Sequence, residues 1–136
     1  MGEPIFHVAL AVDDIRKARA FYLDTLGCWE RADTSGADFS VINFHGAQLV
    51  LIEAPDQVEP SRDDPTLEPY KHFGIIMDWD DWQALASDLK RKGVPFRVAP
   101  NVKDHPGIGK VGNLFLTDPA GNYLEFKSYQ DKSKVL

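Results

Sequence analysis

Two histidines and one glutamate in this sequence are of the types that together bind divalent metals. His7 lies in the apolar run "IFHVALAV", His72 in "YKHFGIIMD", and Glu125 in the closing run "GNYLEF". An ionised carboxylate on an apolar strand is costly to bury unless a cation meets it or its face of the strand is open to water. Whether the three side chains act together depends on the elements that carry them.

The pattern of apolar residues predicts a similar series of elements twice, with three strands recognised in the first half and four in the second. Short apolar or alternating runs predict strands over residues 5–12, 39–44, 47–53, 70–78, 95–100, 113–119 and 122–129. Helices are predicted over 13–27 and 79–93, because each stretch has an apolar stripe and ends at a glycine. In this arrangement His7 corresponds to His72, and Gly46 corresponds to Gly121.

This repeat predicts an α+β fold of two βαβββ modules. Neither half can bury its sheet face alone, so we expect an open, curved, mixed-sheet barrel with the helices on its outer face. We expect one domain over residues 1–136. Its parts are a first module at 1–53, a linking loop at 54–69, a second module at 70–129 and a tail at 130–136.

Alternation along the strands places the three candidate residues on one kind of face. Phe6 and other bulky residues are expected to meet the helix, which turns His7 to the concave side of its sheet. The same reasoning turns His72 and Glu125 to the concave side, where the small Gly74 leaves room for a ligand. Such a set suits Fe(II), Mn(II), Zn(II) or Ni(II) better than Ca(II) or Mg(II). The residues alone are equally compatible with hydrogen-bonded core histidines.

The remaining histidines and the single cysteine are weaker candidates for a functional role. His45 lies in a predicted hairpin turn, and His105 lies in "KDHPGIGK", a glycine-containing loop that we expect to be able to close over a pocket. Cys28 has no histidine near it in the sequence and is expected to be a packed, inert thiol. A lone cysteine forms no internal disulfide, which fits a reducing cytoplasm.

Composition narrows the range of partners. The chain has 136 residues, of which 43% are hydrophobic and 26% charged, and this suits one domain with a full core. Its formal net charge is −6 and it has no basic cluster, so nucleic acid and anionic membranes are not expected partners. No apolar segment approaches the length of a membrane span, and we expect a cytoplasmic protein with a small-molecule substrate.

The segments "FHVALAVDDIRKARAFYLDTLG", "KHFGIIMDWDDW" and "LFLTDPAGNYLEFKSY" together resemble the vicinal oxygen chelate superfamily. That superfamily holds glyoxalase I, extradiol dioxygenases, and the fosfomycin and bleomycin resistance proteins. The resemblance covers nearly the whole chain and is nearest to small single-domain proteins described as predicted extradiol-type dioxygenases. It implies paired βαβββ modules around a divalent metal, with His7, His72 and Glu125 as the metal ligands.

Two departures from the family patterns bear on the reaction. Bacterial glyoxalase I places a ligand Glu on the last strand of the first module, where this chain has Val50, so three ligands remain. Two histidines and one carboxylate with open positions are the usual arrangement for non-haem Fe(II), which we favour over Mn(II), Ni(II) or Zn(II). Extradiol enzymes commonly carry an acid–base His where this chain has Gln48, and often a Tyr where it has Phe115. The acid–base residue is therefore unassigned, with candidates His105, Lys127 and Tyr129.

The resulting prediction is a metal-dependent dioxygenase whose small substrate chelates the metal through vicinal oxygens. By alternation, the predicted substrate contacts are Gln48, Asn113 and Lys127. The alternatives are a glyoxalase-like isomerase or epimerase, a thiol transferase, or a metal-free small-molecule-binding protein of the resistance type. A homodimer is expected by analogy, with the modules pairing either within one chain or across the dimer.

Overall fold

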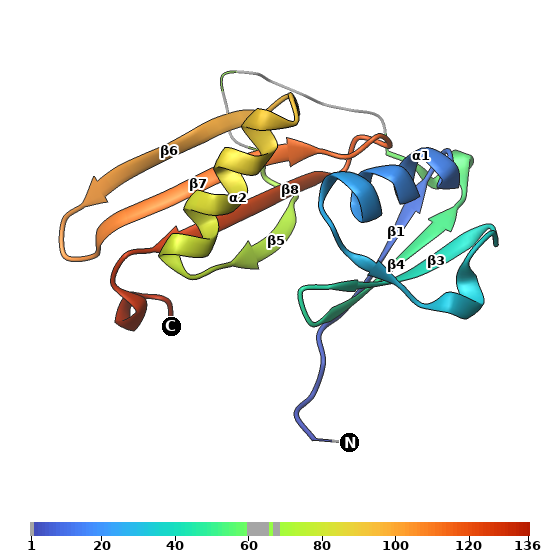
Figure 1. Cartoon of the computed structure of the whole chain (residues 1–136), viewed down its shortest axis with the longest axis horizontal. Helices are drawn as coiled ribbons and strands as arrows, with labels where there is room; N and C mark the ends of the chain where they lie inside the picture. The colour runs from blue at the N-terminus through green and yellow to red at the C-terminus, as the bar shows by residue number, and fades with distance from the viewer. Residues whose placement is uncertain (1, 60–65, 67–68) are drawn as a thin grey trace. The chain divides into compact units, whose positions relative to one another are not determined.

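A computed structural model provides the structure of the chain and describes residues 2–59, 66 and 69–136 (Figure 1). The helices and strands are β1 His7–Val12, α1 Ile15–Arg19, β2 Trp29–Glu30, β3 Phe39–Phe44, β4 Ala47–Glu53, β5 Phe73–Ile76, α2 Trp79–Arg91, β6 Val98–His105, β7 Gly109–Thr117 and β8 Tyr123–Tyr129. Helix α1 continues as a π-helical segment, Ala20–Thr25. This order confirms the predicted α+β fold with two βαβββ repeats.

The strands form two open, four-stranded mixed sheets with matching topology. Their strand orders are β1-β4-β3-β2 and β5-β8-β7-β6, and in each sheet the first pair is parallel and the others are antiparallel. Ala9 pairs with Val50 in the first sheet as Gly74 pairs with Glu125 in the second. Val50 and Glu125 therefore occupy equivalent positions, as the spacing from the two turn glycines predicts.

The chain divides into two compact units, and each is described by itself. The first comprises Met1–Ser61 with Asp118–Gly121, and the second comprises Arg62–Thr117 with Asn122–Leu136. The predicted linking loop at 54–69 lies partly outside the described residues.

Helix α1 covers one face of the first sheet. Asp14 caps the helix, because its side chain accepts hydrogen bonds from the backbone N–H groups of Arg16 and Lys17. Ala18 and Tyr22, from the helix and its π-helical continuation, are fully buried together with Ile42, Leu49 and Leu51 of the sheet. Residues that alternate with these buried ones point to the opposite face of the sheet, which includes His7, Ala9 and Gln48.

Helix α2 lies across β7 and β8 of the second sheet (Figure 1). Its Trp82 is 3% exposed and donates a hydrogen bond from Nε1 to the backbone oxygen of Phe126 at 2.9 Å. Gly112 makes room for the indole, since a Cβ there would lie 2.7 Å from the Trp82 ring. Leu124 and Phe126 are fully buried on this side, so Glu125 between them points to the opposite face.

Two sequence predictions about elements were wrong, and one short strand was missed. The strand β2 went unpredicted, because two residues are too short to show alternation. Phe6 does not meet the helix: it precedes β1 and is 72% exposed. The segment "KDHPGIGK" is no lid loop, because β6 runs to His105 and β7 begins at Gly109, and the two pair as a hairpin.

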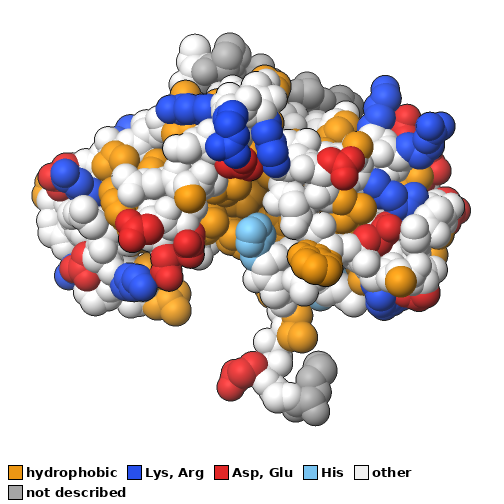
Figure 2. All heavy atoms as spheres, viewed as in Figure 1, with side chains coloured by type: hydrophobic (Ala, Val, Ile, Leu, Met, Phe, Trp, Pro, Cys, Tyr) orange, Lys and Arg blue, Asp and Glu red, His pale blue; other side chains and the backbone are white. Residues whose placement is uncertain are grey.

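The surface carries both signs of charge. On the face shown in Figure 2, basic and acidic side chains are interspersed, and hydrophobic side chains reach the surface between them. Neither helix in the described part of the chain is long and apolar enough to cross a lipid bilayer.

Candidate metal centre

In the first unit, His7 opens β1 and contacts its register partner on β4. The Nδ1–H of His7 donates to Oε1 of Gln48 at 2.8 Å. Because an amide oxygen only accepts, this bond places the proton on Nδ1. In the neutral ring, the lone pair of Nε2 is then left for another partner.

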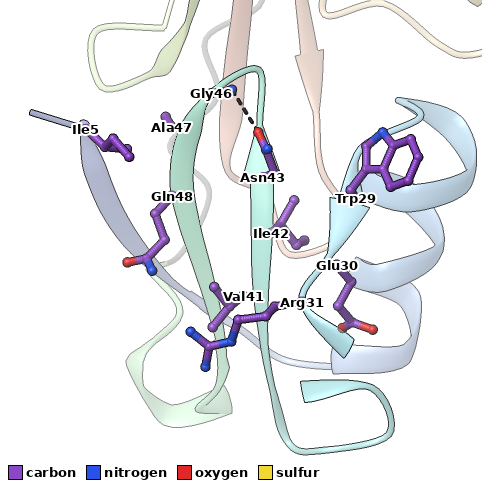
Figure 3. Close-up of a pocket in the computed structure, with 10 residues that line it drawn as sticks. All are labelled: Ile5, Trp29, Glu30, Arg31, Val41, Ile42, Asn43, Gly46, Ala47 and Gln48. Carbon is purple, nitrogen blue, oxygen red and sulfur yellow. Dashed lines mark hydrogen bonds between the residues drawn. The ribbon is translucent and has the colours of Figure 1, made fainter. Parts of the chain in front are cut away.

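An open groove of about 330 Å³ lies beside this pair on the first unit (Figure 3). Figure 3 shows Trp29 on β2 at one side, Gln48 on β4 at the other, and Val41 of β3 between them. Trp29 pairs with Asn43, and Asn43 pairs with Gln48, so the groove runs across the strands toward the His7–Gln48 pair. Apolar groups dominate the lining, and its polar residues are Gln48, Asn43, Glu30 and Arg31.

In the second unit, His72 immediately precedes β5 and lies against Glu125 of β8. Its Nε2 is 3.3 Å from Oε1 of Glu125, and its Nδ1 is 2.9 Å from the backbone oxygen of Pro69. The ring also contacts Phe115 edge-on, with the ring centroids 4.9 Å apart. The glutamate side chain is only 15% exposed. The sheet therefore brings two of the three predicted ligands together.

The carbonyl of Pro69 determines the tautomer of His72. A carbonyl oxygen only accepts, so Nδ1 carries the proton, and in the neutral ring Nε2 presents its lone pair to the carboxylate. Two acceptor atoms that face each other at 3.3 Å need a positive group between them, either a proton or a metal ion. The donor set here, an imidazole nitrogen and a carboxylate, fits a divalent transition metal.

Glu125 is held on its other side by Asn113. The Nδ2 of Asn113 donates to Oε2 of Glu125 at 3.2 Å, while His72 contacts Oε1. Asn113 thus shares the face of Glu125, as alternation predicts. Its donor group is engaged by the carboxylate.

The absent side chain of Gly74 makes room for the backbone of a neighbouring strand. The sequence had suggested that it leaves room for a ligand. A Cβ at Gly74 would lie 1.7 Å from the backbone oxygen of Glu125. The space beside His72 is therefore taken by strand β8 itself. The missing side chain allows β5 to pair closely with β8 at the residue that carries the carboxylate.

The structure places the acid–base candidates at very different distances from Glu125. Lys127 lies two residues along β8 on the same face, paired with Asn113, and its Nζ is 5.2 Å from the ring centroid of Tyr129. His105 pairs with Gly109, six residues along β7 from Phe115, the partner of Glu125. At about 3.4 Å per residue this is roughly 20 Å away within the second sheet. His105 is not brought to the His72–Glu125 pair.

His45 remains a turn residue, as predicted. It has a φ of 51°, is followed by Gly46 with a φ of 93°, and together they join β3 to β4. Its ring packs edge-on against Phe44, and burial lowers the pKa of His45.

Sequence reasoning missed two groups at this centre. The carbonyl of Pro69 has no side-chain signature, so no pattern could have identified it. Asn101 donates to Oδ1 of Asn113 at 2.8 Å, and its place beside the site follows from an irregularity in β6. Among the described residues, no group of three His, Cys, Asp or Glu side chains is clustered closely enough to hold a metal ion. The role of His7 as a third ligand therefore stays a prediction.

Residues 5–126 match the sequence profile of the Glyoxalase/Bleomycin resistance protein/Dioxygenase superfamily, and the chain belongs to this superfamily. A glyoxalase/bleomycin resistance protein/dioxygenase from Alicyclobacillus acidocaldarius is similar over 100% of both chains, with 29% sequence identity and a TM-score of 0.82.

Two further solved structures share the fold and carry different names. The lactoylglutathione lyase from Agrobacterium tumefaciens is 20% identical over 92% of each chain, with a TM-score of 0.66. The fosfomycin resistance protein FosX from Listeria monocytogenes is 15% identical over 99% of this chain and 100% of that chain, with a TM-score of 0.69. At these identities the likeness shows the fold alone.

Proposed function

We propose that the protein is a metal-dependent dioxygenase acting on a small substrate that presents two vicinal oxygens. His7, His72 and Glu125 would hold the metal, with Fe(II) favoured and Mn(II), Ni(II) or Zn(II) as alternatives. Proteins of this superfamily typically bind a divalent metal and a small molecule. A homodimer in the cytoplasm is part of the proposal.

The orientation of the two histidines is the observation that carries this proposal. In both, Nδ1 donates to an oxygen, Gln48 Oε1 for His7 and the Pro69 carbonyl for His72. Metal-binding histidines characteristically donate their other ring N–H in this way, which fixes the tautomer and the ring orientation. Gln48, predicted as a substrate contact, therefore has a second role in presenting His7.

The remaining groups suggest how a substrate would be held. When bound, the metal would supply Lewis acidity to the vicinal oxygens of the substrate. Lys127, on the face of Glu125, would offset negative charge on those oxygens. The apolar groove beside Gln48 would receive the carbon skeleton, with Trp29 at its edge.

A metal assay on protein purified without added metal tests the ligand set. We expect about one equivalent of transition metal per chain, and loss of most of it in His7→Ala, His72→Ala and Glu125→Ala. As a matched control, His45→Asn replaces a histidine by a residue that tolerates positive φ and should keep the metal. Less than about 0.2 equivalents, unchanged in His7→Ala, would rule out the site.

Oxygen uptake separates the dioxygenase from the other reactions of this scaffold. With Fe(II) and a panel of catechols, we expect O2 consumption that is lost in Glu125→Ala. Turnover of an α-oxo-thiol adduct without O2 uptake would instead favour the isomerase or thiol transferase. Tight ligand binding that survives a chelator would favour a metal-free binding protein.

A further inference from the structure

Three polar side chains on adjacent strands of the second sheet form a chain of hydrogen bonds that ends on Glu125. Asn101 of β6 donates from Nδ2 to Oδ1 of Asn113 on β7, at 2.8 Å. Asn113 donates from Nδ2 to Oε2 of Glu125 on β8, at 3.2 Å. The chain therefore crosses the sheet and reaches the carboxylate on the side away from His72.

The direction of every bond in this chain is determined. Both hydrogens of the Asn101 amide are used, since Nδ2 also donates to the backbone oxygen of Ala99 at 2.9 Å. Oδ1 of Asn113 must accept the bond from Asn101, which turns its Nδ2 toward Glu125. Oδ1 of Asn101 is buried and has no hydrogen-bond partner among the described residues. The Asn101 amide thus keeps the orientation in which Nδ2 donates to Asn113, although its own Oδ1 then accepts no hydrogen bond from the described residues.

A bulge in β6 places Asn101 where it can do this. Val98 pairs with Phe115, but Asn101 pairs with Asn113, so β6 contains one more residue than β7 over this stretch. With regular pairing, Pro100 would lie opposite Asn113, and Asn101 would face the other side of the sheet. Bulges characteristically redirect a side chain near functional sites, and proline in a sheet is largely confined to edges and bulges.

We propose that Asn113 and Asn101 are positioning residues that hold the carboxylate of Glu125 with Oε1 turned toward the metal position. Asn113 engages Oε2 and so limits rotation of the carboxylate, and Asn101 fixes which end of the Asn113 amide faces it. This proposal rests on the proposed metal site. In this proposal Asn113 does not make the substrate contact that the sequence predicted, but holds the metal ligand Glu125 by a hydrogen bond.

The metal-free protein tests the hydrogen-bond chain by itself. A double-mutant cycle of Asn113→Ala and Glu125→Ala, followed by urea unfolding, should show non-additivity of about fivefold in the unfolding equilibrium constant. Additive effects within about twofold would overturn the chain of bonds whether or not metal binds.

Metal titration tests whether this chain of hydrogen bonds supports metal binding by Glu125. By calorimetry with Co(II), Asn113→Leu should weaken binding about 10- to 100-fold at unchanged stoichiometry, as loss of an outer partner does. The Co(II) visible spectrum should shift as well, whereas Thr117→Val, on an exposed position of the same strand, should change neither.

Asn101→Asp is the decisive variant, because it keeps the size of the side chain and reverses its bonding. An aspartate accepts from Asn113, turns its amide, and places Oδ1 of Asn113 against Glu125. Binding should weaken about tenfold despite the added negative charge, and tighter or equal binding would overturn the proposal. If wild-type protein binds no metal while the cycle remains non-additive, the proposed function fails, and with it the positioning role, although the bonds are real.

Discussion

At the scale of single residues, the two histidines are oriented by groups of different kinds. His7 relies on the side chain of Gln48, which a mutation can remove, whereas His72 relies on the backbone of Pro69. Orientation of the histidine ring therefore depends on a replaceable side chain in the first unit and on the course of the backbone in the second.

Cys28 is expected to be inert. Burial raises the pKa of its thiol to about 11, from an ordinary value of 9.0. Below both values the thiolate fraction is reduced about 100-fold, and the thiolate is the reactive form. Alkylation of the native protein by iodoacetamide at pH 8 should be slower than that of urea-unfolded protein by about this factor. Equal rates in the two states would contradict the prediction.

The sequence predicted those site residues whose side chains lie on regular strands. Glu125 and Asn113 were found by alternation, because Leu124 and Phe126 mark the buried face. Asn101 was not found, since the predicted strand ended at Pro100 and an inserted residue in β6 shifts the alternation by one. No alternation rule detects such a shift from one strand alone.

At the scale of elements, the contact of β5 with β8 depends on Gly74. Gly74→Ala forces a Cβ against the backbone of Glu125, so we expect a loss of about 1–3 kcal/mol in the free energy of unfolding. Metal affinity should fall as well, because β8 has to move at the ligand residue. Urea unfolding and metal titration measure the two effects. Gly2→Ala, where nothing lies within 4 Å of the new Cβ, is the control.

A largely buried ion pair ties the first helix to β2. Nε of Arg19 donates to Glu30 at 2.7 Å, and the two side chains are 15% and 10% exposed. Arg19 also donates to the backbone oxygens of Thr34 and Phe39. Arg19→Met should cost about 2–4 kcal/mol at pH 7, because it leaves the Glu30 carboxylate without this partner. Arg31→Gln, in the exposed Arg31–Asp33 pair, should change stability little.

The same pair makes a pH-dependent contribution. Burial acts to raise the pKa of Glu30, but hydrogen bonds from Ser40 and Arg19 lower it overall from its ordinary value of 4.5. The contribution is therefore complete above the unfolded-state pKa and is lost as pH falls through the lower, folded-state value. Urea unfolding between pH 7 and pH 3 should show a shallower loss in Arg19→Met than in wild type.

The elements themselves were predicted where they were long and periodic. The strands β3 and β4 lie at the predicted residues, and α2 ends two residues before the predicted Gly93. The hairpin of β6 and β7 was not predicted, because the glycines and the proline around His105 are typical of a loop. These residues form strands because β6 and β7 pair with each other, and not because of their own strand propensity.

At the scale of the whole molecule, His7 can reach the predicted site from the same chain or from a second copy. Ile5, Phe6 and Trp29 are 57%, 72% and 79% exposed, and exposed apolar side chains of this size suit a subunit interface. We therefore expect a homodimer, and pairing of the modules within one chain or across the dimer decides which copy supplies His7.

Mixing two variants that each lack one predicted ligand distinguishes these two pairings. His7→Ala and Glu125→Ala, refolded together in equal amounts, should recover about a quarter of the wild-type metal sites if ligands come from two copies. Half of the dimers would then be mixed, and each mixed dimer would have one complete site. No recovery, in a sample that sedimentation shows to be dimeric, would mean that each chain supplies its own ligands.

The turn between β7 and β8 belongs to the first unit, although both strands belong to the second. There the Tyr22 hydroxyl donates to Oδ2 of Asp118 at 2.7 Å, and burial, reinforced by this carboxylate, raises the pKa of Tyr22. During synthesis, a ribosome that has released only the first half of the chain has not yet supplied this partner. The first unit therefore lacks part of its contacts until residue 121 has been synthesised. For the same reason, cutting the chain at one position cannot yield the two units as separate polypeptides.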